Sequence, residues 1–238
     1  MQVVRLADPD EVAHLAAELI VESVRNGAWR LGVATGSTPI PTYCELIERQ
    51  HRGDADLRHC HLILLDEYLG LPPDHPASYR TTIRRHLAEP ADIPATNVHV
   101  PRLDNGSPHT ADVFTGEIRT LGGVDLQILG IGRNGHIGFN EPGAAPTSRT
   151  RAVELADTTR ADNARFFDRP DEVPTRAVTR GLADIHEARS ILLLATGSAK
   201  APVVYRLLDE RDDDLPASHI HTHPNVTVIV DEPAASML

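Results

Sequence analysis

The densest cluster of polar side chains lies between Gly130 and Pro142, in the segment GIGRNGHIGFNEP. Four glycines in the first nine residues give a backbone that can fold closely around a ligand. His136 lies in this segment, and an imidazole can take up and return a proton near neutral pH. Glu141 follows five residues later and could orient the ring, as carboxylates do for catalytic histidines. The alternative is a glycine-rich turn with a structural histidine; the density of the cluster favours chemistry.

A second candidate is the carboxylate pair of Asp66 and Glu67, which follows the apolar run HLILL at residues 61–65. A carboxylate at the end of a buried strand is partly desolvated, which suits a general base. The alternative is an acid that ends the strand and faces water. The position therefore predicts a general base at Asp66. A carboxylate that only ends the strand and faces water is equally compatible with the sequence.

Two strand–turn–helix junctions could bind an anion. The first is Thr35–Pro39, where glycine, three hydroxyls and the amino end of a helix come together. An ordinary helix cap by Ser37 or Thr38 is the alternative, and the two interpretations are compatible. The second junction is Thr196–Lys200, which carries the only lysine among 23 basic residues. An arginine-rich stretch at residues 148–167 could supply guanidinium groups for phosphate, or could be a solvated helix surface.

The signals for metals and cofactors are weak. His219, His221 and His223 would share one face of an extended segment, but no cysteine or carboxylate obviously completes a metal site. The chain has neither the P-loop pattern nor a G-x-G-x-x-G sequence that opens a helix. We therefore expect neither a metal nor a cofactor.

The elements that must position these residues are those of an α/β protein. Near-continuous apolar runs, typical of strands buried on both faces, lie at 30–34, 61–65, 125–131, 190–195 and 226–230, with edge strands at 3–5 and 97–100. Helical patterns lie at 10–26, 42–50 and 199–209. We predict a single Rossmann-like domain over residues 1–238, with a mainly parallel, doubly wound sheet and flanking helices. Every polar cluster named above follows a strand, where such sheets bind ligands.

Composition limits the partners. The 238 residues are 41% hydrophobic and carry a net charge of −11, which argues against disorder, nucleic acid and anionic membranes. No apolar run is long enough to span a membrane, and the amino-terminal residues are charged where a signal peptide would be apolar. We expect a cytoplasmic enzyme that acts on a small phosphorylated molecule by acid–base chemistry.

The sequence resembles the glucosamine-6-phosphate deaminases, of the glucosamine/galactosamine-6-phosphate isomerase family, over essentially its whole length. The segments that carry the resemblance are Leu65–Arg80 (LDEYLGLPPDHPASYR), Leu129–Gly143 (LGIGRNGHIGFNEPG), Ser148–Phe167, Ala195–Ala201 (ATGSAKA) and His223–Ser236. The GHIGFNEP continuation distinguishes them from the related 6-phosphogluconolactonases. The resemblance implies conversion of glucosamine 6-phosphate and water to fructose 6-phosphate and ammonia without a metal, in amino-sugar catabolism and N-acetylglucosamine utilisation.

The resemblance also implies roles for individual residues. His136 would move protons during opening of the sugar ring, assisted by Asn134 and Glu141, and Asp66 would abstract the C2 proton. Residues expected to hold the phosphate are Gly36, Ser37, Thr38, Arg165 and Lys200, and Gly197 would allow close backbone approach. Residues 149–180 match the mobile lid of the family.

Departures from the family pattern leave some questions open. Position 134 is Asn where some members have Asp, so it can orient but cannot act as a base. Arg151 matches an arginine of the allosteric site of larger members, but Val153 replaces the nearby lysine and the carboxyl-terminal tail is shorter, which disfavours allosteric control. The residues do not separate a monomer from a small homo-oligomer. They also leave open galactosamine 6-phosphate as substrate, a lactonase, and a sugar-phosphate sensor, although no helix-turn-helix extension is visible.

Overall fold

The computed structural model describes residues 1–238 except 73, 103–107 and 213. Its centre is a seven-stranded sheet in which all neighbouring strands are parallel. In sheet order the strands are β1 (Gln2–Leu6), β10 (Val226–Asp231), β9 (Ser190–Ala195), β6 (Leu126–Gly130), β2 (Arg30–Val33), β3 (His61–Leu64) and β5 (Val98–His99). All seven predicted strands are confirmed.

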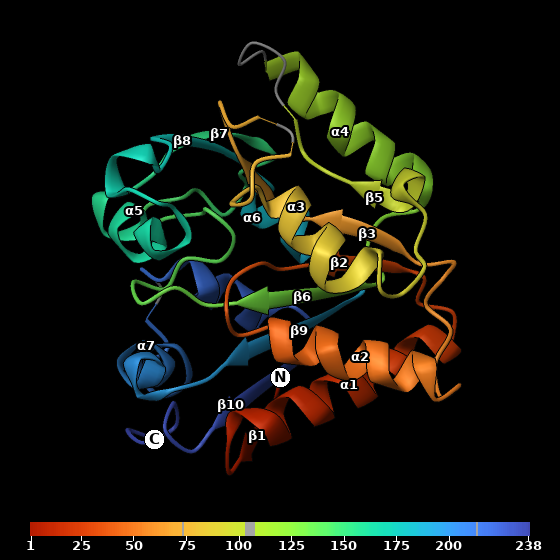
Figure 1. Ribbon diagram of the computed structural model, residues 1–238. Coiled ribbons are helices and arrows are strands. Elements are labelled where there is room, and N and C mark those ends of the chain that lie inside the picture. The colour runs from red at the N-terminus through yellow and green to blue at the C-terminus, as the bar shows by residue number, and fades with distance from the viewer. Residues whose placement is uncertain (73, 103–107, 213) are drawn as a thin grey trace.

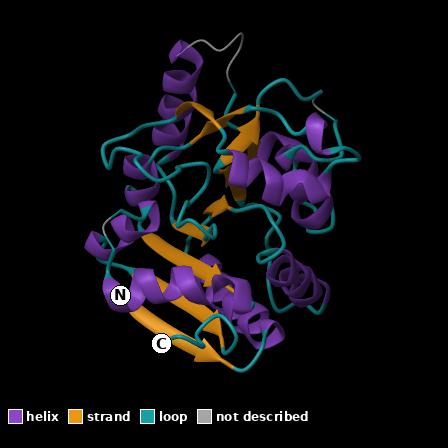
Figure 2. Ribbon diagram, turned by 90° about the vertical axis from the view of Figure 1, so that its left-hand side faces the viewer, coloured by secondary structure: helices purple, strands orange, loops and turns teal. Residues whose placement is uncertain are grey.

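The sheet is buried on both faces, as the continuous apolar runs predict. In β9, Leu192 and Leu194 pack into one core, whereas Ile191 and Leu193 pack into the other. Helices form the outer layers (Figures 1 and 2). The first core is covered by α1 (Pro9–Arg25) and α2 (Ile40–His51), and the second by α4 (Pro108–Leu121), α6 (Leu182–His186) and α7 (Ala201–Tyr205).

Local signals fix several helix ends. Helix α1 begins after Asp8, whose carboxylate accepts hydrogen bonds from the backbone N–H groups of Asp10 and Glu11. The predicted helix at 199–209 is divided into a 3₁₀ turn η6 (Ser198–Lys200), α7 and a π turn η7 (Arg206–Glu210). The remaining helical pieces are α3 (Tyr79–Ile83), η1 (Arg84–Ala88), η2 (Ala95–Asn97), α5 (Asp157–Asn163), η4 (Ala164–Phe166), η5 (Pro170–Glu172) and η8 (Pro216–Thr222).

A second, smaller sheet was not predicted from the sequence. It is antiparallel, in the order β4 (Asp66–Tyr68), β8 (Arg176–Thr179) and β7 (Arg151–Glu154). Asp66 therefore does not simply end β3 but begins a strand of the small sheet. The proposed lid segment forms β7 and β8 together with α5, η4 and η5 between them. In Figure 1, the arrowheads mark the carboxyl ends of β6 and β9, and α5 lies on that side of the sheet.

Among the described residues, no helix combines the length and apolar character required to cross a membrane.

Candidate functional site

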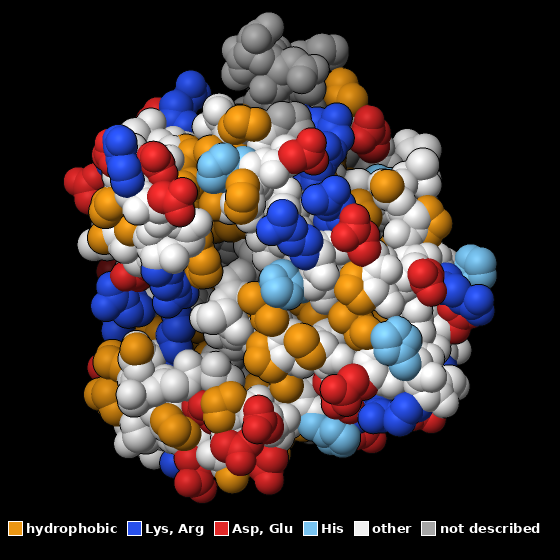
Figure 3. Space-filling model, viewed as in Figure 1, with side chains coloured by type: hydrophobic (Ala, Val, Ile, Leu, Met, Phe, Trp, Pro, Cys, Tyr) orange, Lys and Arg blue, Asp and Glu red, His pale blue; other side chains and the backbone are white. Residues whose placement is uncertain are grey.

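A cavity of about 560 Å³ lies at the carboxyl ends of the central strands. Its size is typical of small-molecule sites. The predicted residues that line it are Gly36, Ser37, Thr38, Asp66, His136, Arg165 and Lys200. The structure thus brings together segments from five separate parts of the chain. In Figure 3, Lys and Arg side chains gather at the left of the molecule, below the region of α5.

His136 is held by Asn134, and Asn134 by Glu141. The ring Nδ1 of His136 lies 2.8 Å from Oδ1 of Asn134, whose Nδ2 donates a 2.6 Å hydrogen bond to Oε2 of Glu141. Because the amide nitrogen of Asn134 faces Glu141, its oxygen faces the ring, and Nδ1 must be the donor. The other ring nitrogen, Nε2, is then the one that can accept a proton.

Glu141 was predicted to orient the histidine, and the structure makes that effect indirect. Nδ1 of His136 and Oε2 of Glu141 are 3.7 Å apart, too far for a hydrogen bond but close enough for attraction between charges. Burial raises the pKa of Glu141, but contacts with His136, Thr159 and Asn134 outweigh it and lower that pKa overall. Glu141 is therefore an ionised anchor behind the histidine, and neither it nor Asn134 lines the cavity.

The glycine at position 132 makes room for the histidine ring. A Cβ atom there would lie 2.2 Å from Cε1 of His136, so a larger residue would displace the imidazole. At Gly138, φ is 56°, which favours glycine, and a Cβ atom would lie 3.0 Å from Oγ1 of Thr179 and in ordinary contact, at 3.4 Å, with Oδ2 of Asp66. The glycine-rich segment thus packs its backbone against the second candidate catalytic residue.

Asp66 is buried, with 6% of its surface exposed, yet it lines the cavity. Burial raises its pKa well above the ordinary carboxyl value, and the negative charge of Glu67 raises it further. A carboxylate with a raised pKa is a stronger base than one in water. Its place beside the cavity confirms that this acid is not a solvated strand end.

The neighbouring carboxylate, Glu67, has a different role. It accepts hydrogen bonds from the backbone N–H groups of Tyr68, Tyr79 and Arg80, and from the hydroxyl of Ser78. It therefore holds the first turn of α3, which places the Tyr79 ring beside the cavity. Of the two adjacent acids, only Asp66 lines the cavity.

The first anion corner precedes α2. Gly36 has φ 106°, a conformation that favours glycine, and Ser37 and Thr38 follow it in the cavity wall. The residue at the helix cap is Pro39, so neither hydroxyl occupies that position. Ser37, Thr38 and the residues at the amino end of α2 thus line the same cavity.

The second corner centres on Lys200. Its Nζ donates a 2.7 Å hydrogen bond to the carbonyl oxygen of Ile131. Burial lowers its pKa, partly offset by Asp162, and the positive charges of Arg165 and Arg133 lower it further. A cluster of cations that repel one another is suited to an anionic ligand. The Gly197 N–H, in contrast, is taken by the buried carboxylate of Asp231, 2.9 Å away, and cannot serve a phosphate.

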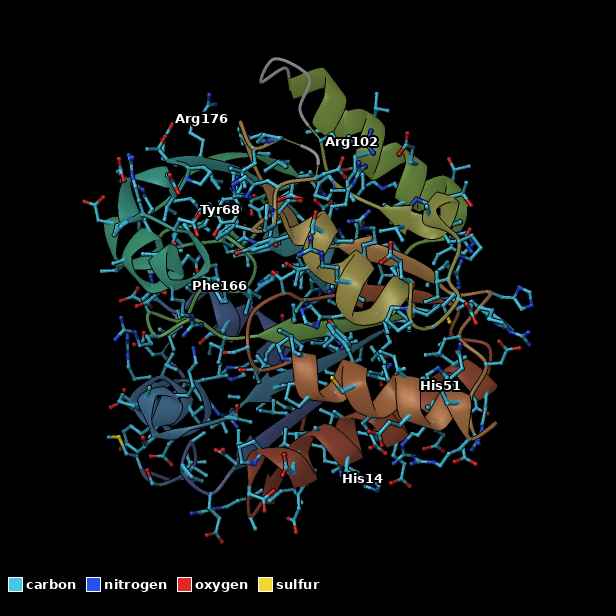
Figure 4. All side chains as sticks on the ribbon, viewed as in Figure 1. His14, His51, Tyr68, Arg102, Phe166 and Arg176 are labelled. Carbon is cyan, nitrogen blue, oxygen red and sulfur yellow. The ribbon has the colours of Figure 1, made fainter. Side chains whose placement is uncertain are left out.

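Arg165 reaches the cavity from η4, within the proposed lid. Its guanidinium carbon lies 4.8 Å from the centre of the Phe166 ring, which is labelled in Figure 4. The other arginines of the stretch lie elsewhere. Arg149 pairs with the buried Asp184 and the exposed Glu187, and Arg151 donates to Asn140.

Sequence reasoning missed several residues of this site, and Tyr79 and Thr159 are two of them. Tyr79 lines the cavity, and Thr159 donates a hydrogen bond to Oε1 of Glu141. Tyr79 falls inside the segment LDEYLGLPPDHPASYR, but nothing in the pattern indicates its direction. Thr159 is 18 residues from Glu141, and only the fold brings them together.

The alternating histidines do not form the extended face required for a metal site. Residues 216–222 form the 3₁₀ helix η8, and the ring of His219 packs 4.8 Å from that of His186. Nε2 of His223 lies 2.8 Å from the carbonyl oxygen of Ala188. In the described part of the chain, no group of three or more His, Cys, Asp or Glu side chains could hold a metal ion.

Comparisons with known proteins agree along the whole chain. A family model described as glucosamine-6-phosphate isomerases/6-phosphogluconolactonase matches residues 7–229. A glucosamine-6-phosphate deaminase of Geobacillus sp. is 45% identical, over all of this chain and 96% of the relative. One from Corynebacterium aurimucosum is 46% identical, over all of this chain and 94% of the relative.

Solved structures show the same fold. A structure described as a monomeric glucosamine-6-phosphate deaminase superposes with a TM-score of 0.95 at 36% identity, covering both chains completely. The 6-phosphogluconolactonase from Trypanosoma brucei superposes with a TM-score of 0.81 at 22% identity, over all of this chain and 98% of that one. At that identity the likeness shows a common fold alone.

Proposed function

Because this chain belongs to the family of glucosamine-6-phosphate isomerases and 6-phosphogluconolactonases, we propose that it acts as a glucosamine-6-phosphate deaminase. The reaction converts glucosamine 6-phosphate and water to fructose 6-phosphate and ammonia. One observation carries this choice within the family. A buried carboxylate, Asp66, and a polarised histidine, His136, line the same cavity as a cluster of cations.

The first step is opening of the sugar ring. Nε2 of His136 takes the proton of the C1 hydroxyl and returns a proton to the ring oxygen, which leaves an open-chain aldehyde with an amine at C2. Asn134 keeps the ring in the required tautomer, since it accepts the Nδ1 hydrogen. Glu141, ionised behind it, stabilises the positive charge that the ring carries between the two transfers.

The second step is proton transfer from C2. Asp66 removes that proton, the electron pair forms the C1–C2 double bond, and the aldehyde oxygen takes up a proton from solvent, which gives an enolamine. Asp66, which has exchanged its proton with solvent, protonates C1, and the nitrogen gives up a proton. The C2 imine that remains is attacked by water and loses ammonia. Carbon acids are weak, so the raised pKa of a buried carboxylate favours this transfer.

The phosphate determines how the sugar is oriented. Ser37, Thr38, Arg165 and Lys200 all line the cavity, and they can offer hydroxyl, guanidinium and ammonium donors to a phosphate. Gly36 allows close approach of the backbone. We propose that residues 149–180 form a lid over the cavity. The part of this segment between β7 and β8 carries Arg165, which lines the cavity.

Other parts of the proposal follow from relatives or from composition. The structural relative is described as monomeric, and we propose the same for this chain, to be tested by sedimentation velocity. We also propose a cytoplasmic role in N-acetylglucosamine utilisation. Galactosamine 6-phosphate is the alternative substrate, and comparison of kcat/KM for the two epimers decides between them.

The decisive assay measures ammonia release from glucosamine 6-phosphate in D₂O, with and without a chelator. We expect ammonia in both cases, and one deuterium at C1 of the fructose 6-phosphate. A lactonase would instead hydrolyse 6-phosphogluconolactone without forming a carbon–deuterium bond. A sensor would bind the sugar phosphate with no turnover.

A further inference from the structure

One face of helix α5 contacts the catalytic half of the site. Thr159, Asp162 and Asn163 lie at positions i, i+3 and i+4, which project from the same side of a helix. Asp162 pairs with Arg133, which belongs to the same loop as His136. All three α5 residues border the cavity.

The other end of this face reaches the aromatic residues beside Asp66. Nδ2 of Asn163 donates a 2.8 Å hydrogen bond to the hydroxyl of Tyr68, which is labelled in Figure 4. The Tyr68 ring also packs edge-on against Phe167, just beyond η4. Polar and aromatic contacts together hold α5 against the cavity.

Thr159 makes the contact with a chemical consequence. It is buried, and its hydroxyl donates to Oε1 of Glu141, while Asn134 donates to Oε2. Each oxygen of the carboxylate therefore has its own neutral donor. We propose that Thr159 is a positioning residue, whose hydroxyl completes the Glu141–Asn134–His136 arrangement only when α5 is docked over the cavity.

The physical argument concerns what Glu141 would lose. If α5 moves away, Oε1 loses its donor, and a partly buried carboxylate with fewer donors is less stable in its charged form. It can also rotate, which would release the amide of Asn134 and with it the ring of His136. Docking of α5 and readiness for ring opening are thereby one event. This inference rests on the proposed function for its kinetic consequence, but the contact itself does not.

The test compares three variants. Thr159→Val keeps the shape and removes the hydroxyl, Thr159→Ser keeps the hydroxyl, and Thr158→Val makes the same change one residue earlier, at an exposed position. For Thr159→Val we expect kcat to fall about 10- to 100-fold, the effect of losing one hydrogen bond to a charged group. Thr159→Ser should recover most of the loss, and Thr158→Val should match the unmodified protein.

A second measurement needs no turnover. His136 is the ionisable side chain that faces Glu141, so its ring resonances in an NMR titration report the ionisation of that carboxylate. We expect the inflection due to Glu141 to move to higher pH in Thr159→Val, and to stay in place in Thr158→Val. This readout stands even if the substrate is another sugar phosphate.

The outcomes separate the two proposals. If the unmodified protein releases no ammonia but the inflection moves as stated, the proposed function fails and the positioning role survives. If Thr159→Val changes KM alone, or leaves the inflection where it was, Thr159 merely packs the helix and the inference is wrong.

Discussion

Replacement of Asp66 by asparagine separates catalysis from stability. The amide has nearly the same shape as the carboxylate, so no cavity forms at this buried position. No residue in the described ranges donates a hydrogen bond to the Asp66 carboxylate, so Asp66→Asn breaks no such contact. The charge and the basicity are lost, and we expect KM to change little.

The expected effect on turnover is large. Loss of a general base lowers kcat by at least about 100-fold, which corresponds to about 2.7 kcal/mol in the activation barrier. The assay is ammonia release at saturating glucosamine 6-phosphate. Solvent deuterium should also cease to enter C1, since the enolamine no longer forms.

The same variant should be more stable than the natural protein at neutral pH. Burial raises the pKa of Asp66 in the folded state, so between the unfolded and folded pKa values the folded protein binds more protons. Stability due to this group is then lost as pH rises through that window. Asp66→Asn removes this loss of stability, because the amide does not ionise. We expect a higher Tm at pH 7 to 8, with about 2–4 °C for each kcal/mol in a chain of this length.

Two results would refute this reasoning. If Asp66→Asn keeps its turnover, another group abstracts the C2 proton. If Tm falls at pH 8 but not at pH 4, the ionised carboxylate stabilises the fold, contrary to its buried and donor-poor environment.

Two further predictions concern the remaining groups of the site. Lys200→Ala should raise KM for glucosamine 6-phosphate about 10- to 100-fold, the effect of one charged hydrogen bond, with partial recovery in Lys200→Arg; an unchanged KM would leave the phosphate to Arg165 and the loop before α2. The double variant His136→Ala/Glu141→Ala should be scarcely slower than His136→Ala, because groups that act together are not additive. Additive losses in kcat would assign Glu141 a separate task.

The central sheet could be predicted because each of its strands is specified by a pattern of neighbouring residues in the sequence. Strands buried on both faces require apolar side chains at successive positions, as in SILLLA at 190–195, and the sequence states this directly. The small sheet could not be predicted in this way. Its strands are three or four residues long, and DEY, RAVE and RAVT have neither continuous nor alternating apolar character. Pairing with distant partners stabilises them, and no local pattern shows it.

The site follows the same division. Its residues follow the ends of strands, so the parallel sheet brings Ser37, Asp66, His136 and Lys200 to one edge. What the spacing does not give is side-chain direction. Glu141 follows His136 by five positions, yet Asn134 provides the hydrogen bonds between them. The bond from Thr159 depends on where the chain returns after the small sheet.

The carboxylates of the site show why their roles cannot be exchanged. Asp66 is buried beside another acid and has a raised pKa, so it can hold a proton taken from carbon. Glu141 is also partly buried, but its donors keep its pKa low and the group ionised. Environments that move the pKa values of neighbouring acids apart assign base and electrostatic roles to chemically similar groups. Asp66 thus receives the proton from carbon, whereas Glu141 holds its charge constant while His136 moves protons at oxygen.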